Sequence, residues 1–218
     1  LTIQSGSLLL DNLKDLEIMD GGSLTMNNGT SITGVSGDNF VQLNGNVTVT
    51  LNGTGDRISD INGFLLYGSG SITFNGTADF SNVGKLKYKS TNIDFVSNLT
   101  GNFTVNEINF NNKNNNSFTN NAVSTITLSS KIKTSGNNDI FTNNGTINVG
   151  TNLENGSTGD NFTVTNSGTM TVSSAVNPNN KTWTINNSGS FTHEGDYSSA
   201  SNLTINNLDT TTTIVSAC

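Results

Sequence analysis

Large apolar residues recur along this chain at a nearly constant interval. Successive members are separated by 24, 24, 31, 23, 23, 21, 21 and 20 positions. This apolar ladder consists of Leu16, Phe40, Phe64, Phe95, Phe118, Phe141, Phe162, Trp183 and Leu203. A period of this size indicates stacked coils, each of which is a copy of one supersecondary unit.

A short Thr-rich phrase follows each of the first eight ladder residues. The phrases are GSLTM, GNVTV, GSITF, GNFTV, VSTITL, GTINV, GTMTV and GSFTH. Apolar and polar residues alternate within them, as in Val47, Thr48 and Val49. Because a period of two places alternate side chains on opposite faces of a strand, the pattern predicts strands with an apolar and a polar face.

The composition agrees with strands joined by tight turns. The chain has 39 Asn, 32 Thr and 23 Gly residues and a single Pro. Asn and Gly suit turns, whereas Thr, Val, Ile and Phe favour strands. We therefore predict an all-β fold, a parallel β-helix (β-solenoid) of about nine coils that forms one unit over residues 1–218. Parallel strands about 4.8 Å apart would make it roughly 40 Å long, with Phe stacked on Phe and Asn on Asn.

Two regions interrupt the period. The step from Phe64 to Phe95 contains about eight additional residues, which we interpret as an irregular insert at 79–91. The segment 209–218 is a tail without the motif, and it ends in the only cysteine, Cys218. Neither end resembles the polar cap that a solenoid needs, so we expect further coils beyond one or both ends and end strands capable of self-association.

The charge excludes several classes of partner. With a net charge of −7, the chain lacks the basic footprint that nucleic acids and anionic membrane surfaces require. No apolar run approaches the roughly 20 residues of a membrane-spanning helix, so we expect no membrane insertion by this segment. A single cysteine allows no intrachain disulfide.

At this level of detail the chain resembles a known family. The segments NNGTINVG (143–150) and NSGTMTV (166–172) are similar to passenger domains of Gram-negative autotransporters (type V secretion), above all the Asn-rich adhesins, with haemagglutinin-like exoproteins as a related alternative. The resemblance implies a right-handed β-helix, an extracellular position at the bacterial cell surface, and adhesion to a protein or glycan on a host or partner cell. It supplies no catalytic motif, and the family's translocator barrel and secretion signal are not found in these 218 residues.

Positive charge is concentrated in one short run, KLKYK at 85–89. Alternation places its lysines on one face of a strand and Leu86 and Tyr88 on the other, and a similar pair flanks Ile132 about two coils later. The candidate ligand-binding residues are Lys85, Lys87, Tyr88, Lys89, Lys131 and Lys133. Lysines could bind a carboxylated or sulfated glycan, but they could equally form a solvated strand face that discourages edge pairing.

Three aspartates precede ladder phenylalanines by two residues: Asp38, Asp139 and Asp160. Stacking should bring Asp139 and Asp160 within about one strand spacing, where like carboxylates repel unless a proton or a cation lies between them. Calcium suits such oxygen-rich turns, but the Gly-Gly-x-Gly-x-Asp calcium repeat is absent. We therefore expect solvated carboxylates and assign no metal site.

The polar residues of the Thr-rich phrases should line one outer face. They are Ser23, Thr25, Asn46, Thr48, Ser71, Thr73, Asn102, Thr104, Thr125, Thr127, Thr146, Asn148, Thr169, Thr171, Ser190 and Thr192. A flat hydroxyl array resembles the face of ice-binding proteins. The simpler interpretation is that Thr is a good exposed strand residue.

Residues suited to catalysis are scarce. Arg57 with Asp56 and Asp60 is the best enzyme-like group, and a turn salt bridge explains it equally well, while His193 is the only histidine. We therefore assign no catalytic residue and no cofactor. The sequence favours a non-enzymatic adhesin segment, a rigid stalk that presents loops such as 79–91. The alternatives are a polysaccharide-degrading β-helix enzyme, which needs clustered carboxylates, and a structural surface protein that assembles end to end.

Overall fold

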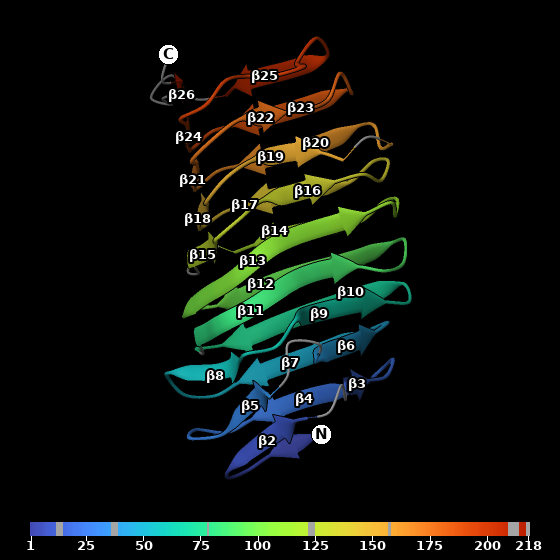
Figure 1. Cartoon of the computed structure of the whole chain (residues 1–218), viewed down its shortest axis with the longest axis vertical. Coiled ribbons are helices and arrows are strands. Elements are labelled where there is room, and N and C mark those ends of the chain that lie inside the picture. The colour runs from blue at the N-terminus through green and yellow to red at the C-terminus, as the bar shows by residue number, and fades with distance from the viewer. Residues whose placement is uncertain are drawn as a thin grey trace.

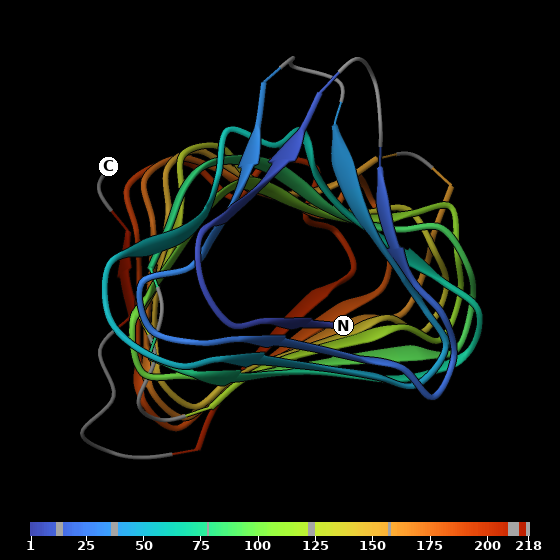
Figure 2. The same ribbon diagram turned by 90° about the horizontal axis from the view of Figure 1, so that it is seen from below.

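The computed structural model describes residues 1–11, 15–35, 39–77, 79–121, 125–156, 158–208 and 214–216. All regular elements in these ranges are β-strands, and all pair in parallel. They form a β-solenoid of about eight turns, close to the nine coils expected from the ladder (Figure 1). Seen from the N-terminal end, the coil is three-sided and turns clockwise as it recedes, which makes it right-handed (Figure 2).

The first side of the coil, face A, is a sheet of ten strands. Its strands are β1 (Thr2–Ile3), β4 (Ser23–Met26), β7 (Val47–Leu51), β10 (Gly70–Gly76), β12 (Ile93–Leu99), β14 (Ser117–Asn120), β17 (Ile140–Asn143), β20 (Phe162–Asn166), β23 (Trp183–Asn187) and β25 (Leu203–Asn207).

The other two sides, faces B and C, belong to one 16-stranded sheet, because two long strands continue from face B into face C. Face B contains β2 (Ser7–Leu10), β5 (Ser31–Gly34), β8 (Asp56–Ser59), β11 (Asp79–Tyr88), β13 (Asn102–Asn111), β15 (Thr125–Leu128), β18 (Thr146–Val149), β21 (Thr169–Val172), β24 (Ser190–His193) and β26 (Ile214–Ser216). Face C contains β3 (Leu16–Ile18), β6 (Phe40–Asn44), β9 (Gly63–Tyr67), the second halves of β11 and β13, β16 (Ile132–Thr134), β19 (Leu153–Asn155) and β22 (Val176–Asn177).

Like side chains stack inside the coil, as the sequence predicts. On face A, the rings of Phe95 and Phe118 lie 5.2 Å apart at 10°, and those of Phe118 and Phe141 lie 5.1 Å apart at 4°. These separations are close to the spacing of neighbouring parallel strands, about 4.8 Å. All three side chains are fully buried.

The apolar ladder, however, is not a single column. Its first three residues lie on face C and the last six lie on face A. Phe40 is offset by one residue, because Val41 rather than Phe40 pairs with Phe64. A second offset places Phe141 beside Val164, while Phe162 pairs with Trp183. The prediction of one continuous column was therefore wrong.

The change of face also explains the long step from Phe64 to Phe95. The register from Gly70 to Ile93 spans 23 residues, as does the next one from Asp94 to Ser117, so this coil has ordinary length. Most of the segment 79–91 is β11, which pairs with β8 and β9 on one side and with β13 on the other. Its irregularity is a register shift between Phe80 and Val83, so the segment is not the insert that we predicted.

Asparagines form a hydrogen-bonded ladder inside the corner between faces A and B. The Nδ2 atom of one residue donates to Oδ1 of the next, at 2.8 Å from Asn120 to Asn143, 2.7 Å from Asn143 to Asn166 and 2.7 Å from Asn166 to Asn187. Asn143 also donates to the carbonyl oxygens of Gly145 and Thr169. This inner Asn ladder therefore satisfies turn carbonyls that the corner buries.

A second ladder occupies the turns between faces C and A. Asn92, Asn115, Asn138 and Asn161 have φ angles of 58°, 57°, 58° and 59°. Each of the last three donates its Nδ2 to Oδ1 of the preceding one at 3.2 Å. Asn tolerates this left-handed backbone better than most residues, so the repeated Asn fits both the turn and the stack.

We expect the inner Asn ladder to contribute more to stability than the outer amides. Replacing Asn143 by Ala leaves the Gly145 and Thr169 carbonyls without this donor in a buried corner, and should lower the free energy of unfolding by about 2–4 kcal/mol. The neighbouring Asn144 forms longer or more exposed contacts, so Asn144→Ala should cost at most about 1 kcal/mol. Urea unfolding followed by circular dichroism measures both, and equal losses would contradict the assignment.

Candidate ligand-binding face

The outward side chains of face C form rows that run along the solenoid axis. The strand registers define three of them. The first row is Phe40, Gly63, Lys85 and Glu107; the second is Glu17, Gln42, Leu65, Lys87, Asn109, Lys133 and Glu154; the third is Asn44, Tyr67 and Lys89. The two predicted lysine groups therefore do lie on the same face of the solenoid.

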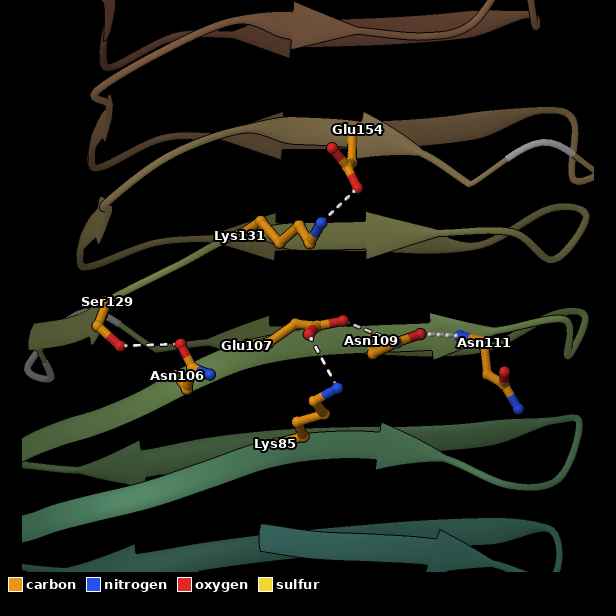
Figure 3. A network of polar contacts seen from close by, with 8 residues as sticks. All are labelled: Lys85, Asn106, Glu107, Asn109, Asn111, Ser129, Lys131 and Glu154. Carbon is orange, nitrogen blue, oxygen red and sulfur yellow. Dashed lines mark hydrogen bonds and ion pairs between the residues drawn. The ribbon is translucent and has the colours of Figure 1, made fainter. Parts of the chain in front are cut away.

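Two of the five lysines are paired with carboxylates (Figure 3). Lys85 Nζ lies 3.5 Å from Glu107 Oε2, and Lys131 Nζ lies 2.8 Å from Glu154 Oε1. The nearly buried Glu107 also accepts a hydrogen bond from Asn109 Nδ2 at 2.5 Å. The Glu154 hydrogen bond raises the pKa of Lys131, so this lysine stays charged at neutral pH.

The other three lysines remain available to an anion. Within the described residues, no ion pair joins Lys87, Lys89 or Lys133 to a carboxylate. Partial burial lowers the pKa of Lys87, and the positive charges of Lys89 and Lys85 lower it further. Because an anion placed here would relieve this repulsion, the arrangement suits a carboxylate or a sulfate group.

Tyr88 does not belong to this outer face. Its side chain is fully buried, its hydroxyl donates to the carbonyl oxygen of Ser117 at 2.6 Å, and its ring stacks on Phe110 at 4.8 Å and 5°. Burial raises its pKa well above the usual value. Tyr88 alternates inward between outward lysines, so including it among the ligand-binding residues was wrong.

Beside the lysines, face C has a shallow hollow. It has a volume of about 220 Å³ and is lined by Phe40, Asn62, Leu65, Lys85, Lys87 and Lys89. The sequence analysis did not include Phe40 and Leu65 among the candidate site residues. It assigned Phe40 to the interior because Phe40 fits the apolar period, and it overlooked Leu65. The signal was present in the run Phe64-Leu65-Leu66: three consecutive apolar residues in a strand cannot all face inward, so the side chain of Leu65 had to point away from the interior.

The predicted pair of neighbouring carboxylates does not form. Asp139 lies at the level of Phe162 in the next coil, while the backbone N–H of Asp160 donates to Asn137. The one-residue offset between β17 and β20 separates the two positions. Asp38 lies outside the described residues. Within the part of the chain that is described, no group of three or more His, Cys, Asp or Glu residues could hold a metal ion.

Asp139 and Asp160 instead occupy contrasting environments. Asp139 is fully buried and accepts hydrogen bonds from Thr134 Oγ1 at 3.0 Å and from the Asn116 N–H at 3.1 Å. Burial raises its pKa to about 7 despite these hydrogen bonds. The backbone N–H of Thr182 donates to Asp160 at 2.6 Å and lowers the pKa of that carboxyl group.

The enzyme-like residues serve the coil itself. The Arg57 guanidinium is buried and donates to the carbonyl oxygens of Thr30, Asn52 and Asn27, so it holds turns of adjacent coils together. Asp60 accepts from Asn82 at 2.7 Å, and the side chain of Asp56 lies outside the described part. His193 is also buried, with Nδ1 2.8 Å from the Gly195 carbonyl oxygen. None of these described side chains faces the hollow on face C.

The Thr-rich phrases divide between two faces. The first three lie on face A, in β4, β7 and β10, and the last five lie on face B, in β13, β15, β18, β21 and β24. The predicted single hydroxyl array was therefore wrong, for the same reason as the single apolar column. On face A, the row of Thr48 and Thr73 continues through Val96, so it is also not uniform in chemistry.

Titration of Asp139 should make the stability of the solenoid depend on pH. Because its folded-state pKa of about 7 exceeds the ordinary value of 3.8, the folded chain keeps this proton to higher pH, and the stabilising contribution of Asp139 is fully present below about pH 4. This contribution is lost as the pH rises to about 7, by roughly 4 kcal/mol in total. Asp139→Asn should remove that loss. The melting temperature of the variant, measured relative to that of the wild type, should therefore increase as the pH rises from 4 to 7. Parallel curves for the two proteins would contradict the prediction.

Comparison of the chain with known proteins gave no match. No protein-family model, no curated protein and no solved structure matches the chain. Among the described residues, no helix is long and apolar enough to cross a membrane.

Proposed function

We propose that the chain is a segment of an extracellular adhesin, a rigid β-helical stalk whose face C binds acidic glycans on a host or partner cell. One observation carries the proposal. Five of the nine Lys and Arg residues of an acidic protein lie on face C, between Phe40 and Glu154. Lys87, Lys89 and Lys133 have no carboxylate partner among the described residues.

The fold supports the role of a stalk. Stacked phenylalanines, buried amide ladders and one continuous apolar core repeat along the axis, so the solenoid resists bending. The resemblance of its Asn-rich segments to autotransporter passengers supports export to the bacterial cell surface. Contact is made by a strand face that includes part of 79–91, because that segment is mostly the strand β11 and not the loop that the sequence suggested.

The charge distribution favours a glycan with few negative charges over an extended polyanion. The chain as a whole carries a net charge of −7, so a polyanion that extends beyond face C meets repulsion. Binding through lysines should weaken as ionic strength rises, because salt screens exposed charges over about 8–10 Å. The enzymatic alternative would instead produce turnover of a polysaccharide, which the same binding samples can reveal.

Neutralising the unpaired lysines should separate specific binding from general charge effects. The variant Lys87→Gln/Lys133→Gln should bind acidic glycans at least tenfold more weakly than wild type, because it removes lysines that lack a carboxylate partner. The control Lys113→Gln/Lys181→Gln makes the same change of charge in turns elsewhere and should bind within twofold of wild type.

Binding to a glycan array and to intact cells, at two salt concentrations, measures both variants. Equal binding by the two double variants would contradict a role for face C. Failure of the wild type to bind any glycan or cell would contradict the adhesin itself.

A further inference from the structure

A glycine lies between two of the residues that line the hollow on face C. Gly63 lies between Phe40 and Lys85 in the first outward row. Its φ angle is +143°, and a Cβ atom there would collide with the backbone oxygen and nitrogen of Lys85. No other residue fits without moving β11, so a gap in the row is built into the backbone.

The walls of the hollow combine apolar surface with positive charge. Phe40 is half-buried at one side, and Leu65, only 7% exposed, lies among the lining residues. Lys87 and Lys89 line it from β11, and Asn62 adds an amide. Small-molecule sites commonly join an apolar surface to a few placed polar groups. An acidic sugar matches this set, because its C–H groups can pack on Phe40 and Leu65 while its anionic group meets the ammonium groups.

The size of the hollow limits the ligand. Its volume of about 220 Å³ lies below the roughly 300–1,000 Å³ of sites for drug-sized molecules. One monosaccharide unit is therefore the part of a glycan that it can enclose.

Charges along the rows limit how the rest of the glycan can run. Toward the N-terminus, Glu17 lies in the second row, and the Asp15 carboxylate accepts from the Phe40 N–H at 2.9 Å. Toward the C-terminus, Glu107 follows Lys85 and Glu154 follows Lys133. A chain with an acid on every unit, lying along the axis, would therefore meet carboxylates on both sides of the lysines.

From these constraints we infer that the hollow beside Gly63 binds a terminal acidic monosaccharide of a glycan, presented end-on, with Phe40 and Leu65 against the sugar ring and Lys87 and Lys89 on its anionic group. The inference rests on the proposed function and specifies its ligand. A carboxylate and a sulfate ester offer the same charge to lysine, so the acidic group can be either one.

Ligand-observed NMR with small probes tests the inference on the full chain. The probes are the methyl glycosides of glucuronic acid, N-acetylneuraminic acid, galactose 6-sulfate and galactose, together with polygalacturonate as the extended polyanion. We expect binding of at least one acidic glycoside, at least tenfold weaker binding of neutral galactose, and no tighter binding of polygalacturonate per chain. The acidic glycoside that binds identifies whether the group is a carboxylate or a sulfate.

Variants locate the site. Phe40→Ala and Lys89→Gln should each weaken binding of the acidic glycoside at least fivefold, whereas Phe40→Tyr, which keeps the ring, and Lys113→Gln, in a turn away from face C, should stay within twofold. Circular dichroism shows whether Phe40→Ala remains folded. If it does not, Lys89→Gln, which changes a surface position, still tests the site.

Two results would contradict sugar binding in the hollow without contradicting the proposed adhesin function. In the first, Lys87→Gln/Lys133→Gln loses glycoside binding, whereas Phe40→Ala and Lys89→Gln bind the glycoside as tightly as the wild type. In the second, the chain adheres to cells but binds no acidic glycoside. Tighter binding of polygalacturonate would also overturn end-on recognition. If the chain binds neither a glycoside nor cells, both sugar binding in the hollow and the adhesin function are contradicted.

Discussion

The structure depends on the fixed spacing of parallel strands. Each coil places its residues about 4.8 Å above those of the previous one, so like side chains meet whenever the register is kept. That distance suits stacked rings, as in Phe95, Phe118 and Phe141, and it also suits a chain of amide hydrogen bonds. A chain with only 32% hydrophobic residues can therefore form a closed interior, because the buried polar residues satisfy one another.

The same spacing explains where polar groups are tolerated inside. Asn143 is buried but uses its amide in both directions along the ladder and on the turn carbonyls. Asp139 occupies a buried position without a matching partner in the next coil, where Phe162 lies, and burial raises the pKa of its carboxyl group. A polar residue inside the coil is therefore stabilised by repetition, and a solitary one is stabilised only by its local hydrogen bonds.

The sequence predicted the architecture well and the placement of individual residues less well. The period, the alternation and the Asn-rich turns were sufficient to predict a parallel solenoid with stacked phenylalanines. They could not assign strands to faces, because all three walls of the coil alternate apolar and polar residues in the same way. An offset of one residue moves a side chain from inside to outside, which is why Phe40 lies on the surface although it fits the period.

The candidate site likewise combines a feature that the alternating pattern predicts, the row of lysines, with one that it does not predict, the hollow. Alternation placed Lys85, Lys87 and Lys89 together correctly, since it depends only on neighbours within one strand. The hollow that they line takes its other residues from earlier strands, and no local pattern reveals that a side chain at Gly63 would collide with β11. Yet that collision follows from close parallel stacking, because β11 passes directly beside the glycine. The close stacking that fills the interior with repeated side chains thus also requires a glycine between Phe40 and Lys85, two of the residues that line the hollow.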